Sequence, residues 1–150
     1  MADFQTYQRG RDSMPKRPDK KQISNWANKL RNVKYSHHGR DENGLDCFGI
    51  LLHFCKTFDV DMPDYVYDDD WRLKNIKLLN EYHKYGKEIE EKEAFAGDVV
   101  LIKNCKWGIN HVGIMISKTK VIHCTKEGVC VNSTMGNNRI HQYVRLNWDD

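Results

Sequence analysis

Cys47 is the residue of this sequence best placed to act as a nucleophile. It opens an apolar run over 47–58 that predicts a buried helix, and the residue before it, Asp46, is of a type that caps helix N-termini. The first turn of a helix carries partial positive charge, which stabilises a thiolate and lowers a cysteine pKa from about 8.5 to between about 3.5 and 7.5. We therefore expect Cys47 to be reactive at neutral pH. The alternative is that Cys47 is a small buried hydrophobe, as we expect of the other cysteines, Cys55, Cys105, Cys124 and Cys130.

Two histidines on predicted strands could supply the base that a thiol nucleophile requires. His111 begins one apolar run, and His123 lies near the end of the next. Neighbouring antiparallel strands would bring both imidazoles to one edge of a sheet, and a helix packed on that sheet would add Cys47. The sequence thus predicts a nucleophile, a base and an orienting group, as in cysteine peptidases. For either histidine alone, a purely structural role is the alternative.

Metal and cofactor motifs do not accompany these residues. The sequence has no C-x-x-C or H-E-x-x-H spacing, and its adjacent pairs, His37-His38 and His123-Cys124, do not suit tetrahedral chelation. It also lacks a glycine-rich phosphate loop. We expect a site without a metal or a cofactor, and no nucleic-acid partner.

The first half of the chain is expected to be helical. Residues 1–22 are expected to form a basic arm without a core of its own, either a solvated tail or a docking segment, and residues 23–150 to form the domain. Ser24 is expected to cap a helix whose buried stripe is Ile23, Trp26, Leu30 and Val33. After the helix at 47–58, another helix is expected from about residue 69 to 85.

The second half changes to a strand-like pattern. Gly86 is expected to end the helix before it, and residues 88–93 to form a solvated charged link. Five runs rich in β-branched residues then follow, at 99–102, 111–116, 121–124, 129–131 and 140–146. Helices followed by a run of strands predict an α+β fold, with the helices packed on a mostly antiparallel sheet of about five strands.

Composition places the chain among single globular domains. It has 150 residues, with 24 Lys+Arg against 21 Asp+Glu, and 39% hydrophobic residues, which excludes a mostly disordered chain. The five cysteines are odd in number and show no paired spacing, as expected in a reducing compartment. No apolar run approaches the length of a membrane span, and the first residues do not resemble a signal peptide. We therefore expect no membrane partner and no export by the general secretion route.

Several motifs occur together and in a characteristic order. They are Gly44-Leu-Asp-Cys-Phe-Gly-Ile-Leu, Met62-Pro-Asp-Tyr, Gly97-Asp-Val-Val-Leu-Ile, His111-Val-Gly-Ile-Met-Ile and Val121-Ile-His-Cys. In this order they resemble the signature blocks of the NlpC-like cysteine peptidases, over about residues 24–132. The resemblance implies a papain-like α+β core and cleavage of peptides in bacterial peptidoglycan.

The resemblance also assigns roles to individual residues. Cys47 matches the family nucleophile, His111 the base and His123 the third polar residue. Tyr35 matches a tyrosine whose hydroxyl lies near the oxyanion site, with a half-buried packing ring as the alternative. Asp46 matches an aspartate beside the nucleophile and is expected to contact substrate, although its capping position would explain it without substrate.

Phe48 departs from the family pattern. Cell-wall endopeptidases of this family commonly have a small hydroxyl residue at this position, so the substrate subsite is expected to differ here and to include Phe48. An aromatic residue here, with a Pro-Asp-Tyr turn after the helix, resembles the subgroup encoded with phage tail-tip proteins. The resemblance implies peptidoglycan as substrate, tail-tip proteins as partners, and assembly in a host cytoplasm before incorporation into the virion.

Two other functions remain open for the same scaffold. The chain could be a structural or assembly protein of a phage tail that retains the peptidase fold without activity. It could also be an amidase or acyl-transfer enzyme that uses the same cysteine and histidine, although the sequence offers no groove for an acyl chain.

Overall fold

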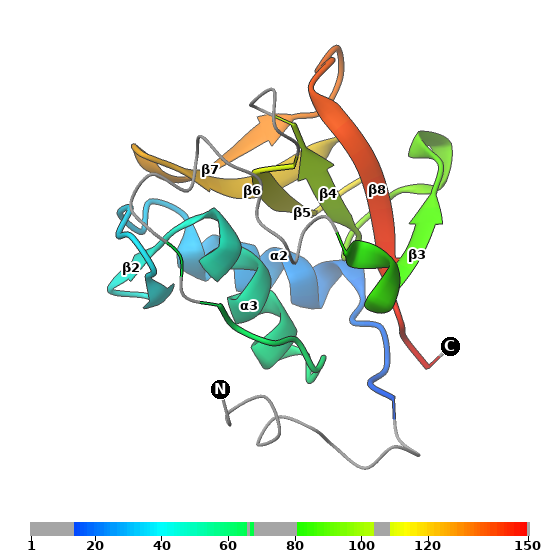
Figure 1. Cartoon of the computed structure of the whole chain (residues 1–150), viewed down its shortest axis with the longest axis horizontal. Helices are drawn as coiled ribbons and strands as arrows, with labels where there is room; N and C mark the ends of the chain where they lie inside the picture. The colour runs from blue at the N-terminus through cyan, green and yellow to red at the C-terminus, as the bar shows by residue number, and fades with distance from the viewer. Residues whose placement is uncertain (1–13, 66, 68–80, 104–108, 150) are drawn as a thin grey trace.

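A six-stranded antiparallel sheet with two helices on one face makes up most of the described part of the protein (Figure 1). The computed structural model describes residues 14–65, 67, 81–103 and 109–149. The strand order is β3-β8-β4-β5-β6-β7. The strands are β3 (Gly86–Ile89), β4 (Val99–Ile102), β5 (His111–Met115), β6 (Lys120–Thr125), β7 (Gly128–Ser133) and β8 (Ile140–Leu146). The predicted α+β class and the antiparallel sheet are confirmed.

The remaining elements are short apart from two helices. The helices are α2 (Lys20–Leu30) and α3 (Cys47–Thr57), with single turns of 3-10 helix at η2 (Tyr82–Lys84) and η3 (Glu91–Glu93). Two two-residue strands, β1 (Arg40–Asp41) and β2 (Gly44–Leu45), pair ahead of α3. The predicted helix over 69–85 lies mostly outside the described residues.

Helix α2 begins earlier than the sequence pattern indicates. Asp19, not Ser24, is its N-cap: the Asp19 side chain accepts from the Gln22 N–H at 2.8 Å, and the Gln22 side chain accepts from the Asp19 N–H. This reciprocal capping box satisfies two N–H groups at once, so it fixes the helix start more firmly than Ser24 could inside the helix. Ile23, Trp26 and Leu30 of the predicted stripe are buried in α2, whereas Val33 lies beyond the end of the helix and is half-buried against the core.

The two faces of the sheet bury different side chains. Alternate residues point to opposite faces of a strand, so Val112 and Ile114 of β5 face α2 and α3, whereas Met115 faces away. The larger core lies between the helices and the sheet, and it includes Phe48, Phe54 and Leu101. This core fixes α3 against β5, the strand that begins with His111.

The segment expected to be a charged link is part of the sheet. β3 pairs antiparallel with β8, with Gly86 opposite Leu146 and Ile89 opposite Tyr143, so Gly86 begins a strand. Lys87 and Glu88 between them are exposed, as is usual on an edge strand. Because these two residues are charged, the sequence pattern did not indicate a strand here. The described sheet therefore has six strands instead of about five.

The last part of the expected basic arm is packed against the domain. Arg17 bonds the carbonyl of Ala96 at 2.7 Å and the carboxylate of Asp98 at 3.1 Å, and its guanidinium lies 4.2 Å from the Phe95 ring centroid. Asp98 is fully buried and also accepts two bonds from Arg145 of β8. Residues 14–22 thus belong to the fold, because the buried Asp98 carboxylate requires a cation on this side.

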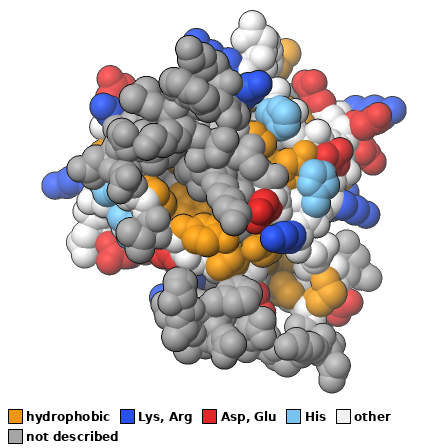
Figure 2. All heavy atoms as spheres, viewed as in Figure 1, with side chains coloured by type: hydrophobic (Ala, Val, Ile, Leu, Met, Phe, Trp, Pro, Cys, Tyr) orange, Lys and Arg blue, Asp and Glu red, His pale blue; other side chains and the backbone are white. Residues whose placement is uncertain are grey.

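Charges of both signs are mixed on the surface. On the face shown in Figure 2, the Lys, Arg, Asp and Glu side chains of the described residues are interspersed around the periphery. None of the helices in the described part of the chain is long and apolar enough to cross a membrane.

Candidate active site

Cys47 lies in the first turn of α3, with its sulfur against the beginning of β5. The Asp46 side chain caps the helix by accepting from the Gly49 N–H at 2.8 Å, as the sequence predicted. The Cys47 Sγ lies 3.8 Å from the Asn110 carbonyl oxygen and receives a backbone hydrogen bond from Val112. These two residues flank His111, so the structure brings the thiol to the point of the sheet where His111 stands.

The thiol of Cys47 is protonated in this structure, contrary to our expectation of a thiolate. Burial is the main cause and raises the pKa of Cys47 well above its usual value, and the neighbouring Asp46 carboxylate raises it further. The Val112 N–H and Arg40 act in the opposite direction but do not offset this. The same aspartate that caps the helix therefore opposes ionisation of the residue that follows it.

His111 and His123 lie together, as the strand pattern predicted. β5 and β6 are antiparallel neighbours, and Nε2 of His111 lies 2.8 Å from Nδ1 of His123. The second nitrogen of His123, Nε2, lies 2.7 Å from Oδ1 of Asn132 on β7. Three consecutive strands thus supply a line of hydrogen-bonded groups that starts at His111 and ends at Asn132.

His111 is held in its neutral form. Burial, and secondarily the neighbouring His123, lower its pKa to about 3. A neutral imidazole is a competent proton acceptor, whereas an imidazolium is not. Burial thus favours the uncharged forms of both the Cys47 thiol and the His111 imidazole.

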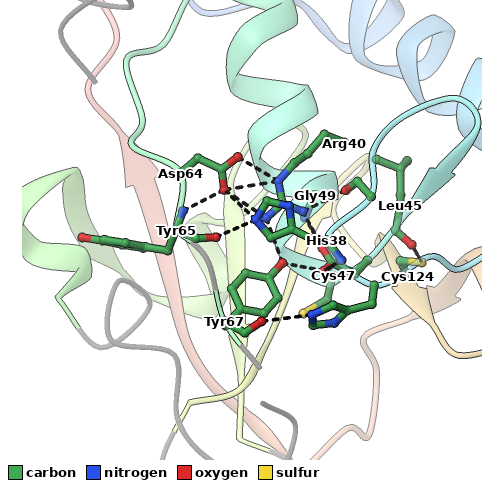
Figure 3. A network of polar contacts seen from close by, with 12 residues as sticks. His38, Arg40, Leu45, Cys47, Gly49, Asp64, Tyr65, Tyr67 and Cys124 are labelled. Atoms are coloured by element: carbon green, nitrogen blue, oxygen red, sulfur yellow. Dashed lines mark hydrogen bonds and ion pairs between the residues drawn. The ribbon is translucent and has the colours of Figure 1, made fainter. Parts of the chain in front are cut away.

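A network of polar contacts that includes Arg40, Asp64 and Tyr67 lies near the start of α3 (Figure 3). The fully buried Asp46 carboxylate pairs with Arg40 at 3.0 Å and also accepts from the Tyr67 hydroxyl and, at 2.8 Å, from the His38 backbone N–H. Arg40 in turn bonds both carboxylate oxygens of Asp64. A buried carboxylate is stable only when its oxygens are occupied in this way.

Two histidines join the loop before the nucleophile to the segment after α3. Nε2 of His37 lies 3.0 Å from the Tyr67 carbonyl oxygen, and Nε2 of His38 lies 2.8 Å from that of Tyr65. Imidazole N–H groups are the donors in both contacts because a carbonyl oxygen can only accept. Together with Arg40, they hold Tyr65 and Tyr67 beside the start of α3.

Asp46 and Phe48, which the sequence predicted to contact substrate, are both fully buried in this structure. Phe48 has no exposed surface: its ring stacks on Tyr65 at 6.5 Å between centroids and meets the Tyr67 ring edge-on at 6.1 Å. Asp46 is occupied by the bonds described above. Both residues contact the segment that contains the two tyrosines, and their contact with substrate stays a prediction.

Tyr35 lies in the strand-like segment before the nucleophile. Its backbone forms an isolated parallel bridge with Leu45, two residues before Cys47, and its ring is half-buried against the main core. This position is compatible with both roles that the sequence left open, the packing ring and the oxyanion donor.

Several residues of the site were not found from the sequence. Arg40 and Tyr67 carry no local motif, because their importance arises from contacts with Asp46 that only the folded chain makes. Asn132 could have been found: the β6–β7 hairpin pairs His123 with Cys130, so residue 132 lies on the same face, two positions along. Within the described ranges, no group of three His, Cys, Asp or Glu side chains is arranged to hold a metal ion.

A thiol at a helix N-terminus, packed against an antiparallel sheet that carries a histidine pair, defines the papain-like class of cysteine peptidases. Residues 32–147 match the model of the NlpC/P60 family, and the chain belongs to this family of cysteine peptidases. The chain is 29% identical over 117 residues to a probable endopeptidase of Haemophilus influenzae, covering 77% of this chain and 65% of that protein. It therefore spans less than two thirds of the length of this relative.

Solved structures show the same fold. The NlpC/p60 domain of the peptidoglycan hydrolase SagA is 21% identical, with a TM-score of 0.64 over 86% of this chain and all of that domain. An NlpC/P60 family protein from Bacillus cereus is 16% identical, with a TM-score of 0.69 over 93% of this chain and 43% of that protein. NlpC2 from Trichomonas vaginalis is 15% identical, with a TM-score of 0.68 over 85% of this chain and 46% of that protein.

Proposed function

We propose that this protein is a cysteine endopeptidase that cleaves the stem peptides of bacterial peptidoglycan. The observation that carries the proposal is the contact of the Cys47 sulfur with the backbone of Asn110 and Val112, the two residues that flank His111, together with the hydrogen bond between the His111 and His123 rings. Membership of the NlpC/P60 family supports the reaction class, and the structural similarity to a domain of the peptidoglycan hydrolase SagA supports the substrate class.

The proposed reaction begins with the protonated thiol. As the Cys47 sulfur attacks the peptide carbonyl carbon, His111 takes the thiol proton, and negative charge develops on the carbonyl oxygen. Backbone N–H groups at the start of α3 and the Tyr35 hydroxyl are the proposed donors to that oxygen. The C–N bond then breaks, the departing amine takes the proton from His111, and water hydrolyses the thioester to release the carboxylate and restore the thiol.

The test is cleavage of purified peptidoglycan by the full chain. We expect the wild type to release muropeptides that mass spectrometry identifies, and Cys47→Ala to release none while retaining its circular dichroism spectrum. Cys55→Ala is the matched control, because Cys55 is also buried in α3 but lies eight residues further along the helix. Full activity of Cys47→Ala would refute the nucleophile, and loss of activity in His111→Ala with retained folding would support the base.

We also propose that the domain works as part of a phage tail, made in the host cytoplasm and carried in the virion. The feature that supports this is the aromatic unit of Phe48 with Tyr65 and Tyr67, which includes the residues that resemble the tail-tip subgroup. Purified virions should contain the protein at the tail tip, and its absence from them would contradict the proposal.

The burial of Cys47 favours one further candidate, a non-catalytic tail protein that retains the fold. Under it, the pure protein would release no muropeptides but would still co-purify with tail proteins. Release of muropeptides that depends on Cys47 would exclude it.

A further inference from the structure

Asn132 ends the hydrogen-bonded line that begins at His111. Its Oδ1 lies 2.7 Å from Nε2 of His123, while the other nitrogen of that ring lies 2.8 Å from His111. Because Asn132 is itself exposed, its side chain adds little to the packing of the core. Its position is explained better by an effect on the histidines than by an effect on stability.

The direction of the proton in each bond follows from the chemistry of the groups. An amide oxygen can only accept, so a 2.7 Å contact with Oδ1 requires the proton of His123 to reside on Nε2. In a neutral imidazole the other nitrogen, Nδ1, must then be an acceptor, so Nε2 of His111 donates to it. His111 in turn keeps its Nδ1 unprotonated, which leaves this nitrogen able to take the thiol proton.

Cys130 indicates why the Asn132 amide points its oxygen at His123. The Cys130 Sγ lies 3.4 Å from Oδ1 of Asn132 and 3.6 Å from Nε2 of His123. A thiol is a weak donor, and an oxygen at this point can accept from both the thiol and the imidazole. If the amide were turned round, its NH2 group would face the Cys130 sulfur, and the S–H donor would lose the oxygen that accepts from it.

We propose that Asn132 is a positioning residue that sets the reactive tautomer of His111 through His123, and that Cys130 orients the Asn132 amide. With the Asn132 oxygen removed, His123 is free to carry its proton on Nδ1, His111 then accepts at Nε2, and its Nδ1 becomes protonated. That tautomer cannot accept the proton of Cys47. The inference rests on the proposed endopeptidase function only for its kinetic readout.

The first measurement is the tautomer itself, which needs no substrate. Long-range 15N–1H NMR spectra of the full chain should show the protons of His111 and His123 on Nε2 in the wild type. In Asn132→Leu, which keeps the size of the side chain but has no acceptor, His123 should shift toward the Nδ1 proton. A wild-type His123 proton on Nδ1, or an unchanged tautomer in Asn132→Leu, would overturn the proposal.

The second measurement is cleavage of peptidoglycan stem peptides. Asn132→Leu should lower kcat roughly 10- to 1000-fold with little change in KM or Tm. This decrease is smaller than the ~10⁴-fold decrease in kcat that a fully wrong histidine tautomer causes in a serine protease. Asn132→Asp keeps the acceptor and should retain activity near neutral pH. The acid limb of the pH–activity profile of Asn132→Asp should move to higher pH, because a carboxylate favours the charged form of the adjacent His123 imidazole. Asn28→Ala, an exposed asparagine on α2, is the control.

The role of Cys130 is tested by a pair of variants. Cys130→Ser keeps a donor to Asn132 and should retain most of the activity, whereas Cys130→Ala should lose several-fold in kcat. Equal activity of the two variants would overturn the role of Cys130. If the wild-type protein cleaves no stem peptide, the proposed function fails, but the NMR spectra still decide whether Asn132 sets the tautomer.

Discussion

The rings of His111 and His123 stand nearly perpendicular, at 82° with their centroids 5.0 Å apart. In this arrangement Nε2 of His111 lies 2.8 Å from Nδ1 of His123, so one hydrogen bond joins the two half-buried imidazoles. Two imidazolium ions could not occupy these positions without strong repulsion. The neighbouring imidazole therefore adds to burial, the main cause of the lowered pKa of His111.

Acid should destabilise the protein through His111. Its pKa is about 3 in the folded protein and about 6.5 in an unfolded chain, so the unfolded state binds more protons between these values. The free energy of unfolding should therefore fall as pH falls from about 6.5 to about 3, by up to ~1.4 kcal/mol per pH unit from this group.

Urea unfolding at several pH values measures this dependence. His111→Gln should show a shallower decrease in unfolding free energy than the wild type over the same pH range. His141→Gln, at an exposed position on β8, should follow the wild type. Parallel curves for the wild type and His111→Gln would contradict the assignment.

Alkylation of Cys47 should accelerate with pH up to the alkaline range. Since burial and Asp46 raise the pKa of this thiol, its thiolate fraction increases about tenfold per pH unit near neutrality. Mass spectrometry of iodoacetamide-treated protein, quantified separately for the Cys47 peptide between pH 6 and 9, measures the rate. A rate that reaches a plateau below pH 7 would show a preformed thiolate instead.

Removal of Arg40 should destabilise the domain strongly. Arg40→Met leaves the fully buried Asp46 carboxylate without its cation, and we expect the free energy of unfolding to fall by about 3 kcal/mol. Asp64→Asn, which alters the exposed partner of the same guanidinium, should cost less than about 1 kcal/mol. Chemical denaturation of both variants gives the comparison, and equal losses would argue against a special role for the buried pair.

Arg17 should stabilise the domain although it lies in the sequence segment that looks like a tail. Arg17→Ala removes one of two cations from the buried Asp98, and we expect a loss of about 1.5–3 kcal/mol in the free energy of unfolding. The neighbouring Lys16 is exposed, so Lys16→Ala should change stability by less than about 0.5 kcal/mol. Thermal unfolding of the two variants would contradict this if their Tm values were the same.

Elements with strong local patterns were predictable from the sequence. The cap by Asp46, the helix that follows and the five apolar strands all depend on residues within a few positions of one another. The exposed edge strand β3 was not predictable in this way. Lys87 and Glu88 break the alternation of apolar and polar residues that is typical of a strand, and β3 is defined by its pairing with β8. The start of α2 was missed because Asp19 and Gln22 lie in a segment that composition alone marks as a basic arm.

The candidate site likewise has features that were predictable from the sequence and one that was not. The positions of Cys47, His111 and His123 followed from helix and strand placement, whereas the ionisation state of Cys47 did not. A helix N-terminus is recognisable in a sequence, but the burial that outweighs it depends on packing against residues far along the chain, such as Asn110 and Val112. Sequence patterns thus locate reactive groups better than they predict the charge those groups carry.

The position of β8 has a consequence for how the protein is made. This strand, which follows the other described strands in the sequence, lies between β3 and β4 and pairs with both. Until residues up to Leu146 have left the ribosome, β3 has no partner and β4 is bonded on one side only. The sheet that carries the histidines can therefore close only after β8 has been synthesised, and a chain that terminates before β8 leaves two open strand edges, which can template aggregation.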